Sequence, residues 1–393
     1  MKNSIFAPDM KKFGLLPRII IAIAMGLLIG NVLPESGVRV FVTFNALFSQ
    51  FLDFLIPLII VGLVVPAIAD IGQSAGKLLL LTVGLAYADT ILSGLLGYTT
   101  GSMIFPQLID ANASTAIEKP DMLKPYFELQ IPPFLDVMAA LVSSFVIGIG
   151  IAYTNSPTLK KGCEEFRTII EKTIQTAIIP ILPLYIFGIF LSMTFTGEAY
   201  KALLVFAKII CIIFVLHIVI LLYEFLIAGA VARKNPLRML MNIFPAYLTA
   251  LGTSSSAATI PVTLKQTKKI GVSDEIASFC VPLCATIHIA GSTMKITCCA
   301  LTVCLIEGLP HSLPLFLHFI IILGICMVAA PGVPGGAAMA ALAPLAGILG
   351  FDPNAQAVMI ALYIAMDSFG TACNVAGDGA LAVIIDRLHR KKA

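Results

Sequence analysis

Four polar side chains fall on one side of an otherwise apolar stretch near the C-terminus of the chain. The stretch MDSFGTACNVAGDGALAVII (366–385) carries Asp367, Thr371, Asn374 and Asp378 at spacings of four, three and four residues. Because an α-helix turns by about 100° per residue, all four share one helix face. Carboxylates inside a membrane are costly and usually mark a substrate, an ion or a proton relay. We therefore expect Asp367 and Asp378 to face cations, either a substrate ammonium group or a metal ion.

The composition predicts a polytopic membrane protein. Of the 393 residues, 59% are hydrophobic and 12% are charged, whereas soluble proteins carry about 25% charged residues. No cleavable signal peptide is evident, and the first apolar run is long enough to be a transmembrane helix. The nine cysteines lie mostly in apolar runs and form no C-x-x-C pair, which indicates packing residues and no transition-metal site. No nucleic-acid partner is expected.

Eight apolar segments are long enough to cross a bilayer, and two others are interrupted. The eight spans are predicted at 15–33, 40–69, 78–105, 134–153, 168–195, 202–231, 276–306 and 354–386, and the interrupted segments at 243–264 and 313–350. If both interrupted segments are re-entrant hairpins, most Lys and Arg residues lie on the cytoplasmic side together with both termini. The loop residues left outside are then Arg39, Lys119, Lys124 and Lys201. The predicted fold is therefore all-α, with eight transmembrane helices and two re-entrant helical hairpins in the cytoplasmic membrane.

Both interrupted segments carry breaks of a kind suited to a transport site. The first contains GTSSS (252–256), and the second contains APGVPGGA (330–337), whose prolines and glycines disfavour a continuous helix. Paired broken hydrophobic segments are a sequence indication of a transporter binding site. A helix that starts at the serines suits a carboxylate. Together with an ammonium group at Asp367, this pattern fits a zwitterion such as an amino acid.

Further ionisable residues lie in other predicted spans. His288, Ser292 and Lys295 are spaced four and three residues apart, which predicts one shared helix face. A buried Lys295 ammonium needs a partner. The other carboxylates within spans are Asp53, Asp89 and Glu224. For Asp53 and Glu224, the simplest interpretation is a side chain that reaches the membrane surface from a helix end.

Four segments in this order resemble the signature motifs of a known family. SSSAATIP, PLCATIHIAGS, GVPGG and DSFGTACNVAGD resemble those of the dicarboxylate/amino acid:cation symporters. This family includes the glutamate transporters and the bacterial serine/threonine sodium symporters, and the latter branch is the closest in pattern. The resemblance covers most of the chain.

The resemblance implies a glutamate-transporter-like elevator fold in a homotrimer. Residues 1–75 and 106–195 would form a static scaffold, and residues 76–105 and 196–393 would form a mobile transport domain. The second hairpin would be the extracellular gate. The coupling ion would be Na⁺ or H⁺, and no other cofactor is implied.

The resemblance also implies candidate site residues. The substrate candidates are Ser255, Ser256, Ser292, Val333, Asp367, Thr371 and Asn374, with Lys295 as a further candidate. The serines and Asn374 would hold the α-carboxylate, and Asp367 with Thr371 would hold the amino group. The cation candidates are Cys284, Thr286, His288, Met327, Val328, Ala330, Asn374 and Asp378, with Tyr87, Asp89 and Thr90 as further candidates.

Two departures from the family pattern bear on the ion and on the substrate. The family's NMDGT is HIAGS here, so Ala290 replaces an aspartate and the protonatable His288 replaces an asparagine of the cation sites. Members with acidic substrates carry an arginine where this chain has Gly370. Because a buried substrate carboxylate without a counter-charge is costly, Gly370 favours a small neutral amino acid. The sequence leaves open whether Lys295 restores acid selectivity or pairs with Asp367 or Asp89.

The sequence thus predicts a secondary active symporter that imports a small neutral amino acid, of the serine, threonine or alanine type, with Na⁺. The alternative is a symporter for an acidic amino acid or C4-dicarboxylate with proton coupling. A channel would also fit paired hairpins, but it would pass current without saturable, gradient-driven uptake. An intramembrane hydrolase using Ser256 and His288 lacks a G-x-S-x-G or similar context. We therefore expect a transporter and not an enzyme.

Overall fold

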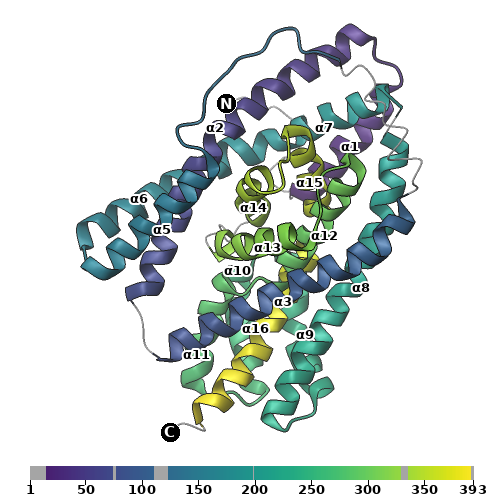
Figure 1. Cartoon of the computed structure of the whole chain (residues 1–393). Coiled ribbons are helices and arrows are strands. Elements are labelled where there is room, and N and C mark those ends of the chain that lie inside the picture. Colours follow the sequence, from purple (N-terminus) through teal and green to yellow (C-terminus); the bar gives the residue numbers. More distant parts are fainter. Residues whose placement is uncertain (1–14, 74–76, 110–122, 198, 329–334, 391–393) are drawn as a thin grey trace, which may run out of the picture.

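The computed structural model of the chain describes residues 15–73, 77–109, 123–197, 199–328 and 335–390. These residues form helices and connecting loops, with no strand among them (Figure 1). Six helical stretches within the described part are long and apolar enough to cross a membrane: Glu35–Pro66, Lys77–Leu108, Pro157–Phe195, Leu203–Ala232, Asp274–Glu307 and Asp367–His389. Shorter apolar helices complete the fold. The prediction of an all-α polytopic membrane protein is confirmed.

One group of helices comes from the N-terminal half of the chain. It contains α1 (Leu15–Gly30), α2 (Glu35–Gln73), α5 (Val137–Thr154), α6 (Pro157–Thr173), the π-helix η2 (Ile174–Ile178) and α7 (Ile179–Phe195). Helix α2 packs against α5, α6 and α7, and α1 packs along α7. A Cβ atom on Gly30 would lie 2.9 Å from the carbonyl oxygen of Leu191. Small residues allow this close helix contact, as is common inside membranes.

A second group surrounds the last helix of the chain. It contains α3 (Lys77–Leu108), α8 (Ala199–Ala232), α9 (Pro236–Thr253), α10 (Ser256–Lys269), α11 (Asp274–Ile287), α12 (Ala290–Glu307) and α16 (Asp367–Arg390). Helix α16, yellow in Figure 1, packs against each of the other six. Most of its side chains are buried. The polar residues of α16 are therefore enclosed by protein and do not face lipid.

The two interrupted segments form pairs of short helices that pack against each other. In the first pair, α9 ends at Thr253 and is capped by Ser254, whose φ of 49° is left-handed. The Ser255 hydroxyl accepts a hydrogen bond from the Ala258 amide at the start of α10. This serine cap is why the helix restarts at that point. The second pair consists of α13 (Leu313–Val328) and α14 (Gly336–Gly347). The segment between them, 329–334, lies outside the described residues.

Two predicted spans are broken in the middle of their length. The span 276–306 is divided into α11 and α12 by His288 and Ile289, and His288 has an extended backbone with φ −101° and ψ 106°. The span 354–386 is divided into α15 (Pro353–Ala365) and α16 by Met366. The prediction that His288 shares a helix face with Ser292 and Lys295 is therefore wrong. The break places His288 between the two helices.

Side chains from other helices satisfy the backbone groups that these breaks expose. Oδ1 of Asn374 on α16 accepts hydrogen bonds from the Gly291 and Ser292 amides at 2.9 and 3.3 Å, which caps the start of α12. The Met366 carbonyl accepts from the Lys295 ammonium at 3.2 Å. Helix ends leave amide and carbonyl groups without intrahelical partners. Here those partners are distant in the sequence.

Candidate functional site

The interrupted helices begin close to one another around Asp367. This residue opens α16 and is 7% exposed, and its Oδ2 accepts a hydrogen bond of 2.9 Å from the amide of Gly335, which caps α14. The Ser254 hydroxyl, next to the start of α10, lies 2.6 Å from the Ser368 hydroxyl on α16. The starts of α10, α14 and α16 thus meet. Helix starts carry partial positive charge and amide donors, which favour an anionic group.

A lysine ammonium lies beside this meeting point. Lys295 on α12 is fully buried, and its Nζ lies 3.9 Å from Oδ1 of Asp367. The same Nζ is 3.5 Å from the centre of the Tyr363 ring, a favourable cation–π distance. Among the described residues, Asp367 supplies the carboxylate within ion-pair distance of Lys295. Of the two acidic partners considered from the sequence, the structure therefore pairs Lys295 with Asp367. We call Lys295, Tyr363, Asp367 and Gly335 the Asp367 cluster.

Asn374 and Thr371 lie between this cluster and the lower part of α16. The Asn374 amide donates to the Ser292 hydroxyl at 3.0 Å, in addition to capping α12. The Thr371 hydroxyl donates to the Asp367 carbonyl at 3.1 Å. Both side chains are buried. The predicted polar face of α16 is thus hydrogen-bonded to α12. A ligand that binds Asn374 would share this side chain with the Gly291 and Ser292 amides, which Asn374 caps.

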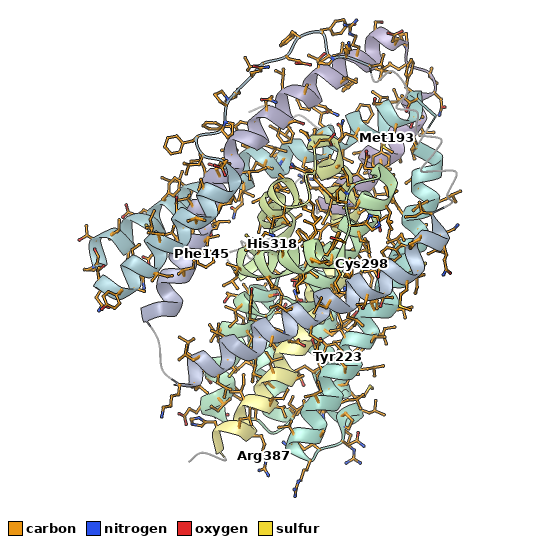
Figure 2. The ribbon with its side chains drawn as sticks, in the orientation of Figure 1. Phe145, Met193, Tyr223, Cys298, His318 and Arg387 are labelled. Atoms are coloured by element: carbon orange, nitrogen blue, oxygen red, sulfur yellow. The ribbon has the colours of Figure 1, made fainter. Side chains whose placement is uncertain are left out.

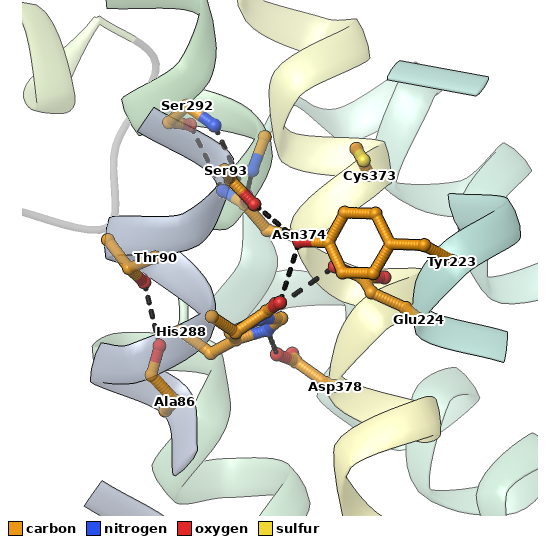
Figure 3. A network of polar contacts seen from close by, with 12 residues as sticks. Ala86, Thr90, Ser93, Tyr223, Glu224, His288, Ser292, Cys373, Asn374 and Asp378 are labelled. Carbon is orange, nitrogen blue, oxygen red and sulfur yellow. Dashed lines mark hydrogen bonds and ion pairs between the residues drawn. The ribbon is translucent and has the colours of Figure 1, made fainter. Parts of the chain in front are cut away.

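A second polar cluster surrounds His288 (Figure 3). Its Nδ1 lies 3.0 Å from Oδ1 of Asp378 on α16, and its Nε2 lies 2.8 Å from Oδ2 of Asp89 on α3. The other oxygen of Asp89 accepts a hydrogen bond from the Tyr223 hydroxyl at 2.7 Å. The Tyr223 hydroxyl also bonds Ser93 at 2.7 Å. The His288 ring therefore connects α16 to α3 through two carboxylates.

Glu224 completes this second cluster. Its Oε1 lies 4.0 Å from Nε2 of His288, its side chain is 2% exposed, and neither oxygen has a hydrogen-bond partner among the described residues. The interpretation of Glu224 as a side chain at the membrane surface is therefore wrong. Gly377 makes room for it, because a Cβ atom there would lie 2.6 Å from Oε2 of Glu224 and 2.7 Å from Cε1 of His288. We call Asp89, Glu224, His288 and Asp378 the His288 cluster.

The His288 cluster contains three carboxylates and one imidazole away from solvent. An ionised carboxylate can only accept hydrogen bonds, so the ring donates from both nitrogens and is cationic when Asp89 and Asp378 are both ionised. With Glu224 ionised as well, negative groups outnumber positive ones, and the buried charge must then be compensated by a proton or another cation. Single ligand atoms of Asp89, Glu224 and His288 lie within 4.8 Å of one another, close enough to hold one small cation. The cluster is suited to bind a cation or a proton.

Other predicted cation residues occupy different surroundings. The Tyr87 hydroxyl donates to the Ile321 carbonyl on α13, and Thr90 donates to Ala86 within its own helix. The Thr286 hydroxyl donates to Leu283. Met327 and Val328 end α13, and the Cys284 carbonyl accepts from the His288 amide. Ala330, like the substrate candidate Val333, lies outside the described residues, and so does the side chain of Asp53. Tyr87 and Thr90 therefore contact neither His288 nor its carboxylates through the hydrogen bonds they make.

The remaining substrate candidates lie at the start of α10. Ser255 caps the helix, and Ser256 is its first residue. Sequence reasoning missed Tyr363 of the Asp367 cluster, and also Tyr223 and Gly377, which contact the His288 cluster. Tyr223 adjoins Glu224 in LLYEFL, and a hydroxyl next to a carboxylate in an apolar run was the available signal. Tyr363 and Gly377 carried no signal beyond composition.

Comparison with known families agrees with this arrangement. The family model described as "Sodium:dicarboxylate symporter family" matches residues 15–388. The chain belongs to the sodium:dicarboxylate symporter family. This match extends over nearly the whole chain and so includes both broken pairs and both clusters. The resemblance drawn from the four motifs is thus confirmed, and so is the glutamate-transporter-like fold. As a member of this symporter family, the chain is a multi-pass membrane protein that transports a small molecule.

Proposed function

We propose that this family member moves a small solute bearing a carboxylate across the cytoplasmic membrane together with a cation. The observation that carries the proposal is the position of both clusters on one helix. Asp367 at the start of α16 belongs to a cluster suited to an anion, and Asp378 on the same helix belongs to a cluster suited to a cation. The two aspartates are eleven positions apart, or about 16 Å along the helix axis.

The residues between the two clusters provide a route for coupling. Asn374 bonds Ser292 and caps α12, and Lys295 of the Asp367 cluster is on that same helix. One residue, Ile289, separates His288 from the first residue of α12. A ligand that shifts the start of α12 at one cluster therefore changes the geometry at the other. Such mutual stabilisation is a coupling free energy, which acts equally in both directions.

The proposed site keeps the substrate residues assigned from the resemblance and, of the assigned cation residues, those of the His288 cluster. Ser255, Ser256, Ser292, Asp367, Thr371 and Asn374 would bind the solute, and Val333 would belong to the gate. His288 and Asp378, supported by Asp89, would bind the coupling cation, for which Na⁺ is the first expectation and H⁺ the alternative. Three hydrogen bonds support this assignment. They join His288 to Asp89 on α3, Asn374 to the start of α12, and Asp367 to the Gly335 amide at the start of α14.

The transport cycle is proposed to follow the elevator scheme in a homotrimer, with both termini cytoplasmic. The grouping of helices supports a division of the chain. Helices α1, α2, α5, α6 and α7 pack among themselves, and α3 with α8 to α12 gathers around α16. Residues 1–75 and 106–195 would form the scaffold, and 76–105 with 196–393 the mobile domain. Both clusters lie wholly in the proposed mobile domain.

Uptake into proteoliposomes tests the proposed function. Purified protein is reconstituted, and uptake of labelled serine, aspartate and succinate is measured under three conditions. These are an inward Na⁺ gradient, an acid-outside gradient in choline, and no gradient. Saturable uptake of at least one solute that depends on a cation gradient is expected. Protein-free liposomes are the control.

Two results would contradict the proposed function. The first is the absence of gradient-driven uptake of all three solutes by a monodisperse protein. The second is a current through the reconstituted protein without saturable uptake, which is the behaviour of a channel. Uptake driven only by acid would keep the proposal and replace Na⁺ by H⁺ as the coupling ion.

A further inference from the structure

Lys295 supplies a buried positive charge directly beside Gly370 on α16. We propose that Lys295 is the specificity-determining residue of the solute site, and that it selects a small dicarboxylate over a neutral amino acid. This inference rests on the proposed function and names its substrate class. It reverses the preference for a small neutral amino acid that Gly370 indicated in the sequence.

The ammonium group of Lys295 fills the space above Gly370. A Cβ atom on Gly370 would lie 2.9 Å from Nζ of Lys295, 3.3 Å from its Cε, and 3.3 Å from the Ser292 hydroxyl. Any side chain at position 370 would therefore meet the lysine directly. A cation from α12 thus occupies the volume that a side chain at position 370 of α16 would fill.

The hydrogen-bonding capacity of this ammonium is only partly used. An ammonium has three donors, and the described contact within hydrogen-bond distance is the Met366 carbonyl at 3.2 Å. Asp367 lies farther away, at 3.9 Å, and its other oxygen already accepts from Gly335. A fully buried cation requires a close counter-ion to offset its desolvation. A solute carboxylate next to Lys295 would provide one.

The positions of these two charges disfavour a neutral amino acid at this site. Asp367 and Lys295 together have no net charge, so a zwitterion that places its ammonium against Asp367 also places it close to the Lys295 ammonium. Like charges in a buried site repel strongly. A zwitterion also brings one carboxylate, which the helix starts at Ser256, Gly336 and Asp367 attract. Its uncharged side chain would then leave Asp367, at 3.9 Å, as the charged partner of Lys295.

A dicarboxylate supplies Lys295 with a carboxylate from the solute. One carboxylate can lie at the helix starts and the second at Lys295, whose ammonium would then lie close to both this carboxylate and that of Asp367. Aspartate and succinate both carry two carboxylates, but only aspartate has an amino group. A comparison of the two solutes therefore shows whether Asp367 binds that amino group. If Asp367 is satisfied by Lys295, succinate binds well. If Asp367 needs the solute ammonium, aspartate binds better. In either case, the second carboxylate is what Lys295 recognises.

The first test removes the charge and compares solutes. Lys295→Leu and Lys295→Arg are reconstituted beside the wild type, with Lys208→Leu as a matched control because Lys208 is exposed on α8. The wild type is expected to take up succinate or aspartate in preference to serine. In Lys295→Leu, the KM for the preferred dicarboxylate should rise at least about 30-fold, as for the loss of a buried charge pair. Lys295→Arg and Lys208→Leu should remain within about fivefold of the wild type.

The second test moves the charge to α16 and separates recognition from a structural role. In the double variant Lys295→Leu with Gly370→Arg, the shortened residue 295 leaves room for an arginine side chain from position 370. Recovery of at least about tenfold in KM for the dicarboxylate, relative to Lys295→Leu alone, is expected. If Lys295 had only a structural role, an arginine placed at position 370 on another helix would not restore the KM for the dicarboxylate. Each variant is first checked for a monodisperse size-exclusion profile.

The outcomes distinguish this inference from the proposed function. Cation-driven uptake of serine in preference to both dicarboxylates by the wild type would overturn the role of Lys295 and keep the symporter. The same holds if Lys295→Leu transports the dicarboxylate with an unchanged KM. No uptake of any of the three solutes would overturn the proposed function itself.

Discussion

The ring of His288 is held by Asp378, with Nδ1 3.0 Å from Oδ1 of the aspartate. The two residues belong to different broken spans, and this contact fixes the gap between α11 and α12 against α16. Because Nε2 of the same ring lies 2.8 Å from Asp89, whose side chain is 12% exposed, one imidazole bridges two carboxylates. The His288 cluster therefore needs an external cation only for the negative charge that the His288 ring does not compensate.

Asp378→Asn is expected to weaken cation dependence more than folding. The amide keeps an oxygen that can accept from the His288 ring, so the loss in unfolding free energy should be about 1–2 kcal/mol. The negative charge that attracts a cation is lost. The cation concentration for half-maximal uptake should therefore rise at least about tenfold. An unchanged cation titration of uptake would remove Asp378 from the cation site.

Glu224→Gln is expected to reduce the response of uptake to the coupling cation. Glu224 is buried beside His288 with no described hydrogen-bond partner, so this carboxylate is expected to hold a proton or another cation. The glutamine has a similar shape and leaves fewer negative charges to balance. Stimulation of uptake by the Na⁺ or acid gradient should fall at least about fivefold. Glu165→Gln, on the exposed surface of α6, is the control and should behave as the wild type.

Asp367→Asn is expected to separate amino acids from solutes without an amino group. The variant removes the carboxylate that can face a solute ammonium, and it also removes the counter-charge of Lys295. The affinity for aspartate should fall at least about 30-fold, because a buried charge pair is broken. The affinity for succinate should be kept or improved, because Lys295 is then free to bind it. Retained affinity for aspartate or another zwitterion would exclude the role of Asp367 in binding the amino group.

Gly377→Ala is expected to disturb the His288 cluster by steric contact alone. The added Cβ would lie 2.6 Å from Glu224 and 2.7 Å from His288, and overpacking of this kind typically costs about 1–3 kcal/mol. Thermal unfolding in detergent measures the loss of stability, and the cation titration of uptake should shift with it. Gly84→Ala is the matched control, because no atom lies within 4 Å of a Cβ there. Its stability should be unchanged or higher by up to about 1 kcal/mol. Equal stability of the two variants would contradict the packing described around Glu224.

Much of the architecture could be predicted from the sequence, because a bilayer imposes simple rules on it. Long apolar runs must be helical, since no other lone segment satisfies its own backbone in lipid. Serines at 254–256 and prolines and glycines at 331–336 mark breaks that a helix cannot absorb. The spacing of the four polar residues from Asp367 to Asp378 also gave their common burial on α16 correctly. These features depend on neighbours along the chain, which the sequence contains.

The partners of the buried charges depended on contacts between distant segments. The sequence determined that this protein is a helical membrane protein with two broken pairs and a polar face on its last span. Only the tertiary structure decided that His288 lies in a break between helices, that Glu224 is buried beside it, and that Lys295 reaches the space above Gly370. The breaks at His288 and Met366 carry no proline or glycine, since Asn374 and Lys295 from other helices satisfy the exposed backbone groups. Such stabilisation arises only after the helices pack, so no local pattern encodes it.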